Sequence, residues 1–157
     1  MNDAVNIVEV GARDGLQNEA QSVSVNDKIA LVNALTQAGL KHIEAASFVS
    51  PKWVPQMASS AEVLQGIARK NGVIYSALTP NLKGYQLAMD AKADQVAIFT
   101  AASESFCQKN INCSIAESIE RFMPIIDDAK TNNVKVRAYV SCILGCPYEG
   151  HISAEQV

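Results

Sequence analysis

The stretch VEVGARDGLQNE, residues 8–19, carries the strongest signal in the chain. An apolar run over residues 6–10 predicts a strand that ends at Gly11, after which Arg13 and Asp14 stand side by side. A carboxylate at the end of a strand can hold a hard divalent ion, and a neighbouring guanidinium can stabilise charge on an enolate or carboxylate oxygen. The pattern therefore indicates metal-assisted chemistry on an anionic, oxygen-rich substrate.

Outward from this stretch, short β-rich runs alternate with longer segments of helical period. The predicted strands are residues 6–10, 42–46, 73–78, 95–100 and 134–142. Their interiors are almost continuously apolar, which is typical of parallel strands buried on both faces. Strands that alternate with helices predict repeated βαβ units and a parallel sheet.

Four helices are predicted between these strands. They begin after Ser24, near Ser60, after Asn81 and after Ser114, and the second is expected to run to Lys70. Ser24 and Ser114 each stand three residues before an acidic residue, which is the pattern of a capping box. Pro124 falls inside the fourth helix and is expected to kink or split it, because an interior proline costs about 3 kcal/mol.

About five strands and four helices do not close an eight-stranded TIM barrel. Ser153 and Gln156 begin another helix just before Val157. We therefore expect an α/β fold in which residues 1–157 are the N-terminal portion of a single TIM-barrel domain, with the barrel incomplete. An open barrel exposes strand edges and apolar lining, so self-association into a homo-oligomer, such as a dimer, is also expected.

Composition excludes several classes of function. A formal net charge of −3 gives no basic surface for nucleic acid, and no apolar run reaches the roughly 18 residues of a membrane span. The predicted first strand begins too early for a signal or transit peptide, so a cytoplasmic location is expected. The four cysteines lack the two-residue spacing of zinc or redox pairs and are expected to be reduced, some of them buried.

Active sites of TIM barrels lie at the carboxyl ends of the strands. That rule selects the polar residues at or after the ends of the predicted strands: Arg13, Asp14, Glu44, Ser47, Thr79, Asn81, Ser103, Glu104, Tyr139 and Ser141. Glu44 stands out because it interrupts the apolar run HIEAAS, and a buried carboxylate needs a partner. Arg13 is the expected partner, and such a pair would hold the guanidinium in a functional orientation.

Several motifs in order give the sequence a family resemblance. Besides VEVGARDGLQNE, these are IEAASFVSPKWVPQM (residues 43–57), LTPNLKGY (78–85), KNINCSI (109–115) and YVSCILGCPYEG (139–150). Together they resemble the first half of 3-hydroxy-3-methylglutaryl-CoA lyases, TIM-barrel metallolyases of the DRE-TIM superfamily with a pyruvate carboxyltransferase-like domain. The resemblance implies retro-Claisen cleavage of an acyl-CoA substrate, 3-hydroxy-3-methylglutaryl-CoA, to acetoacetate and acetyl-CoA.

The resemblance also implies roles for individual residues. Arg13 matches the catalytic arginine that stabilises the enolate, Asp14 matches a ligand of Mg²⁺ or Mn²⁺, and Glu44 matches an active-site carboxylate. The segments that line the site contain Gln17, Ser47, Asn110 and Tyr139, which are expected to bind substrate. The remaining metal ligands, the general base and the catalytic cysteine loop of the family are expected outside this sequence.

Other readings of these residues remain open. Glu44 could serve a structural ion pair, Tyr139 could pack in the barrel, and Asn110 could cap a turn before the fourth helix. Lys52 and Trp53 fit a loop that faces CoA or a rigid surface loop.

Cys146 lies in GCPYEG, but the family's catalytic cysteine comes from a later loop, so that role is not transferred. Two alternatives to the lyase are a catalytically incomplete half-barrel that acts as a scaffold, and a related aldolase or Claisen synthase of the superfamily. The 157-residue chain alone is expected to be inactive, because one carboxylate is too few ligands for a catalytic metal.

Overall fold

A four-stranded parallel sheet, in the order β1-β2-β3-β4, forms the centre of the molecule in the computed structural model, which describes residues 5–157. The strands are β1 (His42–Ser47), β2 (Ile74–Leu78), β3 (Gln95–Ala101) and β4 (Lys135–Ser141). Each strand pairs with the next in the sequence, as expected for successive βα units. The predicted α/β fold with a parallel sheet is therefore confirmed.

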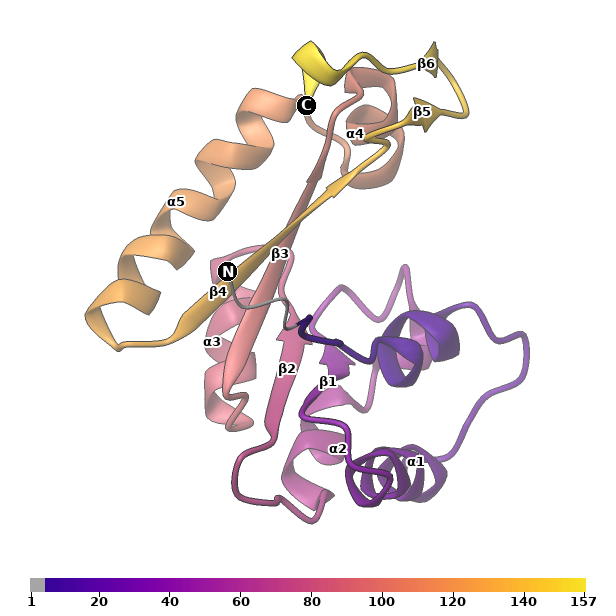
Figure 1. Cartoon of the computed structure of the whole chain (residues 1–157), viewed down its shortest axis with the longest axis vertical. Coiled ribbons are helices and arrows are strands. Elements are labelled where there is room, and N and C mark those ends of the chain that lie inside the picture. Colours follow the sequence, from indigo (N-terminus) through magenta and orange to yellow (C-terminus); the bar gives the residue numbers. More distant parts are fainter. Residues whose placement is uncertain (1–4) are drawn as a thin grey trace.

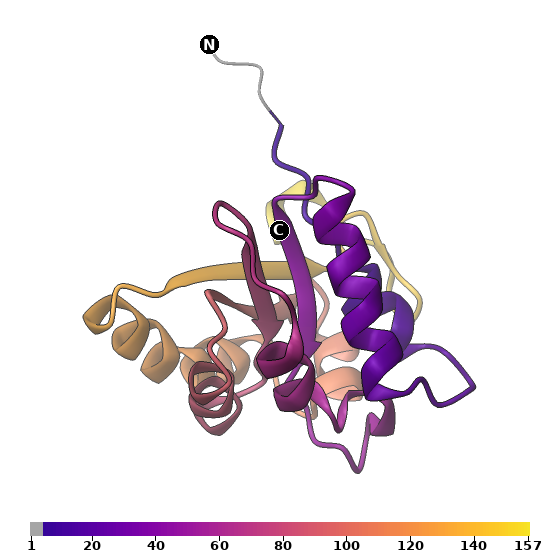
Figure 2. The same ribbon diagram turned by 90° about the horizontal axis from the view of Figure 1, so that it is seen from below.

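Five α-helices accompany the sheet in the described residues. They are α1 (Val25–Gln37), α2 (Ser60–Gly66), α3 (Leu82–Asp90), α4 (Glu104–Ile111) and α5 (Ile115–Thr131). Figures 1 and 2 show α1, α2, α3 and α5 along the outer side of a curved sheet, while α4 lies near the far end of β3. The carboxyl ends of the strands are thereby left for the loops that carry polar residues.

The helix starts agree with the predicted caps. Ser24 Oγ accepts from the backbone N–H of Asp27, and Asn81 Oδ1 accepts from that of Gly84. Ser114 and Glu117 form a complete capping box at α5. These caps satisfy backbone donors that have no partner within the helix, and the sequence showed them because the required residue types stand next to each apolar repeat.

The predicted strand over residues 6–10 is wrong as a strand. Only Glu9 pairs with β1: its N–H donates to His42 O at 2.9 Å, and its carbonyl accepts from Glu44 N at 2.8 Å. Val5 and Ile7 are 85% and 66% exposed. The segment has one neighbouring strand in the described chain, and apolar side chains without a second surface to cover them do not hold a full strand.

Three helical predictions also need correction. The second helix ends at Gly66 rather than Lys70, because residues 67–70 leave the helix to approach β2. Pro124 does not split α5, which continues through it to Thr131. Residues 154–156 form one turn of 3-10 helix after a capping box of Ser153 and Gln156, rather than an α-helix.

Besides the short helical turns Gly11–Gly15 and Pro55–Met57, two elements were not predicted. The first is α4, which begins after Ser103 and ends at Asn112, whose φ of 52° is left-handed. The second is a hairpin of β5 (Gly145–Cys146) and β6 (Gly150–His151) beside α4. Both lie beyond the carboxyl ends of β3 and β4, where a barrel carries its active-site loops.

The core lies between the sheet and the outer helices. Its fully buried members include Ile43, Tyr75, Val96, Ile125 and Ala88, contributed by three strands and two helices. Tyr85 of α3 is also buried, and its hydroxyl donates to Asp128 of α5 at 2.7 Å. The core thus fixes the sheet from one side, so that polar residues on the other side can be held in place.

Candidate active site

The Arg13 segment folds as a π-helical turn, Gly11–Gly15, directly after the Glu9 bridge. Single π-helical turns are rare and often occur at functional sites. The Gly11 N–H donates to Glu9 Oε1 at 2.6 Å, and a Cβ at position 11 would lie 2.7 Å from that oxygen, so a side chain here would displace the flexible Glu9 carboxylate. The turn leaves Arg13 8% exposed and Asp14 on the surface.

Four of the predicted site residues meet in one hydrogen-bonded cluster. Arg13 Nε donates to Glu44 Oε1 at 2.6 Å, and Arg13 Nη1 donates to Asp14 Oδ1 at 2.5 Å. Tyr139 Oη donates to the second oxygen of Glu44, Oε2, at 2.9 Å. We call these four residues the Arg13 cluster. The predicted pairing of Arg13 with Glu44 is confirmed.

The curvature of the sheet makes this cluster possible. Glu44 lies on β1 and Tyr139 on β4, with two strands between them, so their side chains meet only across the inner face of a curved sheet. The register of β1 with β2 shifts between Glu44 and Ala46, and such a bulge changes the direction in which a side chain points. The inner face of the sheet is therefore where the polar cluster lies.

Burial makes the cluster electrostatically strong. Glu44 is fully buried, and both of its oxygens accept hydrogen bonds, as a carboxylate removed from water requires. Burial, together with the charge and the hydrogen bond of Glu44, raises the pKa of Tyr139, so this hydroxyl stays protonated and donates. Within residues 5–157, Arg13 Nη2 is the guanidinium nitrogen that neither carboxylate engages.

Gln17 and Ser47 lie in the neighbouring segments, and each carries a buried polar atom that has no hydrogen-bond partner among residues 5–157. These atoms are Gln17 Oε1 and Ser47 Oγ. Gln17 follows Asp14 by three residues on the same helical turn, so the two side chains share a face. Such atoms are expected to find a partner in a bound molecule, since leaving one unsatisfied costs about 1 to 3 kcal/mol.

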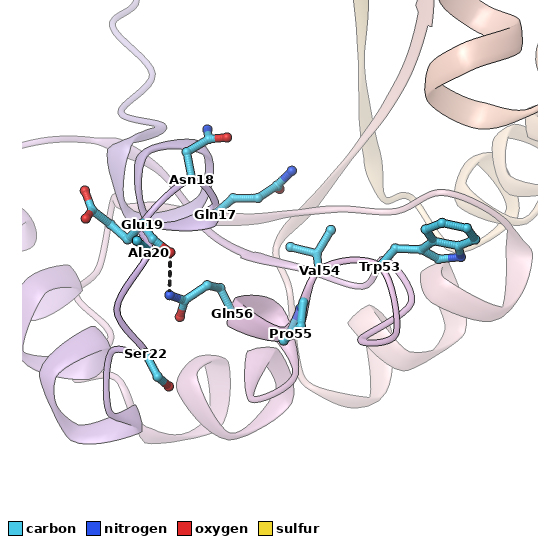
Figure 3. Close-up of a pocket in the computed structure, with 9 residues that line it drawn as sticks. All are labelled: Gln17, Asn18, Glu19, Ala20, Ser22, Trp53, Val54, Pro55 and Gln56. Carbon is cyan, nitrogen blue, oxygen red and sulfur yellow. Dashed lines mark hydrogen bonds between the residues drawn. The ribbon is translucent and has the colours of Figure 1, made fainter.

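A cavity of about 500 Å³ opens beside the turn. Figure 3 shows Gln17, Asn18 and Glu19 on one side of it, with Val54, Pro55 and Gln56 facing them and Trp53 at one end. Trp53 is 87% exposed, which leaves a large apolar surface at the rim. The cavity is thus lined on one side by the residues that directly follow the turn of Arg13 and Asp14, beginning with Gln17.

Other predicted candidates do not join the cluster. Asn110 lies exposed in α4, and no contact in the described residues ties it to Arg13. Asn81 and Ser103 cap α3 and α4, and Glu104 Oε2 accepts from the N–H of Ile115, so these three residues have local structural roles. Asn110 stays a prediction for substrate binding.

The cysteine of GCPYEG is buried and hydrogen-bonded. Ser103 Oγ donates to Cys146 Sγ at 2.9 Å, and the N–H of Tyr148 donates to it at 3.4 Å. Burial acts to raise the pKa of this thiol, but the hydrogen bonds outweigh burial and leave the pKa below its ordinary value. Cys107 and Cys113 are also buried, which agrees with the expectation that some thiols lie inside.

Asp14 fits one position of a divalent-metal site. Its carboxylate is a hard oxygen donor, its side chain is 55% exposed, and the orphaned Gln17 oxygen lies on the same face of the turn. Among residues 5–157, however, no three His, Cys, Asp or Glu side chains lie close enough to hold a metal together.

No helix among residues 5–157 is both long and apolar enough to cross a membrane.

The sheet and its strand-end cluster define part of an α/β barrel of the TIM class, and comparison with known proteins identifies the family. A sequence model of the HMGL-like family matches residues 4–157, and the chain belongs to this family. The chain is 58% identical to a 3-hydroxy-3-isohexenylglutaryl-CoA/hydroxymethylglutaryl-CoA lyase from Pseudomonas aeruginosa, over 98% of the chain and 51% of that protein.

Solved structures agree with this assignment. A hydroxymethylglutaryl-CoA lyase from Pseudomonas aeruginosa superimposes with a TM-score of 0.92 at 58% identity, covering 95% of this chain and 50% of that one. An HMG-CoA lyase from Acinetobacter baumannii, in complex with coenzyme A and 3-methylmalate, superimposes with a TM-score of 0.90 at 38% identity, covering 94% and 48%. The chain spans about half the length of the relatives it matches.

Proposed function

We propose that this chain is the N-terminal portion of a single catalytic TIM-barrel domain that cleaves 3-hydroxy-3-methylglutaryl-CoA to acetoacetate and acetyl-CoA. The observation that carries the proposal is the fixed position of Arg13. Its guanidinium is held by a buried carboxylate and an exposed one, in a member of the HMGL-like family. The substrate is proposed from relatives that carry the name of this lyase.

Arg13 has the geometry of an anion-stabilising group. Two of its nitrogens are engaged by Glu44 and Asp14, so Nη2 can donate to a substrate oxygen without the side chain losing its orientation. When the tertiary hydroxyl of the substrate loses its proton, the carbon–carbon bond breaks and its electrons pass to the thioester carbonyl as an enolate. A preorganised donor at the enolate oxygen lowers the barrier of that step.

Tyr139 and Glu44 support Arg13 rather than reacting themselves. Tyr139 donates to Glu44, which accepts from Arg13, so the hydroxyl acts on the guanidinium through the carboxylate. Gln17 and Ser47 offer oxygens that need a partner, and we propose that they bind substrate. Asp14 would hold Mg²⁺ or Mn²⁺ together with ligands outside the described residues, and the ion would polarise the substrate's oxygens.

The assay for this proposal is release of acetoacetate by the protein as its gene encodes it, with Mg²⁺ or Mn²⁺ added. We expect turnover of the proposed acyl-CoA, and we expect Arg13→Gln to lower kcat by about 10²- to 10³-fold, the usual effect of losing one anion-stabilising donor. Condensation of acetyl-CoA with a 2-oxo acid would instead indicate a Claisen synthase of the superfamily. A folded protein without either activity would favour the scaffold reading.

The cytoplasmic location and the homo-oligomeric state stay predictions. Support for association is the exposure of apolar residues around the end of β4: Val140 is 43% exposed and Leu144 is 83% exposed. Exposed apolar residues close together are often covered by another protein surface.

A further inference from the structure

We infer that Gln56 is a positioning residue of this site, which fastens residues 19–23, just after the turn Gly11–Gly15 that carries Arg13, to the loop of residues 53–57 and so keeps the adjoining cavity formed before substrate arrives. The inference rests on the proposed function, since it assigns a role in substrate binding to that cavity. Gln56 belongs to none of the predicted catalytic, metal-binding or substrate-binding residues. Nothing in the sequence pattern distinguishes it from an ordinary loop glutamine.

The side-chain amide of Gln56 makes three hydrogen bonds to one segment. Its Nε2 donates to the carbonyl of Glu19 at 2.8 Å and to the carbonyl of Gln21 at 2.5 Å. Its Oε1 accepts from the N–H of Val23 at 3.4 Å. One side chain from the loop thus pairs with three backbone groups of residues 19–23. Figure 3 draws the bond from Gln56 to Glu19.

Residues 19–23, which Gln56 holds, directly follow the helical turns that begin at Gly11–Gly15. The N–H of Asn18 donates to Gly15 O and that of Glu19 to Leu16 O, both at 3.2 Å, so the helical turns continue from Asp14 to Glu19. The side-chain amide of Asn18 also donates to the carbonyl of Asp14 at 2.9 Å. A hydrogen bond to Glu19 therefore restrains the C-terminal end of the run of helical turns that begins with Arg13 and Asp14.

Lys28 holds Gln56 from the opposite side. This α1 residue is 7% exposed, and its Nζ donates to the carbonyl of Gln56 and, at 3.3 Å, to Ser59 Oγ. Burial lowers the pKa of the Lys28 ammonium, and its hydrogen bonds go to a carbonyl and a hydroxyl rather than to a carboxylate. Because a buried amine needs hydrogen-bond partners, the contact of Lys28 with the Gln56 carbonyl fixes the backbone of Gln56 in place.

The consequence for the reaction follows from which atoms each contact restrains. Arg13 keeps its own support from Glu44 when Gln56 is changed, so the chemical step retains its main stabilising group. The cavity walls, residues 17–22 and 53–56, lose the side chain that joins them. If these walls must become ordered when substrate binds, the enzyme binds the substrate and the transition state more weakly by the same amount. The variant is therefore expected to have a higher KM and a similar kcat.

The experiment compares Gln56→Glu with the matched control Gln65→Glu, an exposed residue of α2, in the protein as its gene encodes it. Gln56→Glu keeps the shape of the side chain but replaces the donor to two carbonyls by an acceptor. Amide hydrogen exchange followed by mass spectrometry reports on residues 16–23 and 50–58. Steady-state kinetics with the acyl-CoA substrate report KM and kcat separately.

We expect Gln56→Glu to speed amide exchange in both segments by about tenfold and to raise KM by about tenfold, with kcat changed less than about threefold, since the loss amounts to one or two hydrogen bonds. Lys28→Met should produce the same pattern, and Gln65→Glu neither change. A fall in kcat at constant KM would indicate loss of folded protein and overturn the inference. So would faster exchange with unchanged KM, or unchanged exchange.

The exchange measurement needs no turnover, so a failure of the proposed function stays distinguishable. If the unmodified protein has no lyase activity, the proposed function fails and the role in substrate binding fails with it. Unchanged exchange in an active Gln56→Glu enzyme would instead overturn only the positioning role.

Discussion

Glu44 is the most deeply buried side chain of the Arg13 cluster. A fully buried carboxylate is tolerated because Arg13 and Tyr139 saturate both of its oxygens. Replacing a buried ion pair by apolar residues is often neutral for stability, whereas removing one member leaves an uncompensated charge. The pair is therefore better explained by the orientation it gives the guanidinium than by the stability it adds.

Glu44→Gln should lower the free energy of unfolding by about 3 kcal/mol, because it removes the buried counter-charge of the Arg13 guanidinium and leaves only the exposed Asp14. Urea denaturation followed by far-UV circular dichroism measures this loss. The double variant Arg13→Met, Glu44→Leu should recover most of the stability and none of the activity. An exposed carboxylate on α2 provides the control, Glu62→Gln, which should change stability by less than about 0.5 kcal/mol.

In the described chain, one side-chain hydrogen bond joins helix α3 to helix α5. Tyr85 Oη donates to Asp128 Oδ1 at 2.7 Å, and the Tyr85 ring is 1% exposed. Burial, the hydrogen bond and the charge of Asp128 together raise the pKa of Tyr85 to about 12. The contact therefore couples the packing of two helices to the protonation of one hydroxyl.

This coupling predicts an alkaline loss of stability. The unfolded chain releases the Tyr85 proton near the ordinary pKa of 10.0, while the folded chain keeps it until about 12. The contribution of this group is complete below pH 10 and is lost as the pH rises through 12, because the folded state then binds more protons than the unfolded state. Urea unfolding at pH 9 and pH 11 should show a smaller drop for Tyr85→Phe than for the unmodified chain; equal drops would contradict the assignment.

Pro124 is exposed inside α5, where it lacks a backbone N–H and does not contribute to the core. Pro124→Ala should raise the stability by about 1 to 3 kcal/mol, because it restores a backbone donor inside the helix. Thermal unfolding measures the gain, with the exposed substitution Lys130→Ala of the same helix as control. A lower melting temperature for Pro124→Ala would mean that the proline is needed for the path of α5.

The elements that could be predicted are those whose signal is local. Caps such as Ser24 and Ser114 stand next to apolar repeats, and four strands are apolar runs. Each of these elements can therefore be recognised from about a dozen consecutive residues. Helix α4 was missed because Glu104–Ile111 is mostly polar and leaves one residue, Cys107, fully buried. It is stabilised from afar, by Glu149, whose carboxylate accepts from the N–H of Ser105.

The candidate site divides in the same way. Arg13 with Glu44 could be predicted because a carboxylate in an apolar run requires a cation, and the glycines mark a turn that carries one. The bond from Tyr139 to Glu44 could not be predicted from the residues alone, because it depends on the curvature of the sheet. Gln56 could not be predicted either, since its partners are backbone groups, which every residue possesses.

At the scale of the whole molecule, the chain carries one wall of a site. The Arg13 cluster supplies an anion-stabilising group and one oxygen for a metal, and the family relatives are about twice as long. We expect the 157-residue polypeptide, produced alone, to bind Mn²⁺ with a Kd of about 1 mM or weaker, because Asp14 alone is a poor ligand set.

Isothermal titration with Mn²⁺ measures this affinity, and an acetoacetate assay on the same sample accompanies it. The polypeptide should produce no acetoacetate. Detectable product, or micromolar Mn²⁺ binding that Asp14→Asn abolishes, would show that these residues complete a metal site among themselves.

The distance along the chain between Tyr139 and Glu44, 95 residues, sets an order of assembly for the site. Arg13 and Glu44 are separated by 31 residues, so closing the longer loop costs about 1 kcal/mol more. On a ribosome that adds about 5 to 20 residues per second, the hydroxyl emerges roughly 5 to 20 s after the carboxylate it supports. During synthesis Arg13 can thus pair with Glu44 first. The hydrogen bond from Tyr139 to Glu44 forms later, once β4 has joined the sheet.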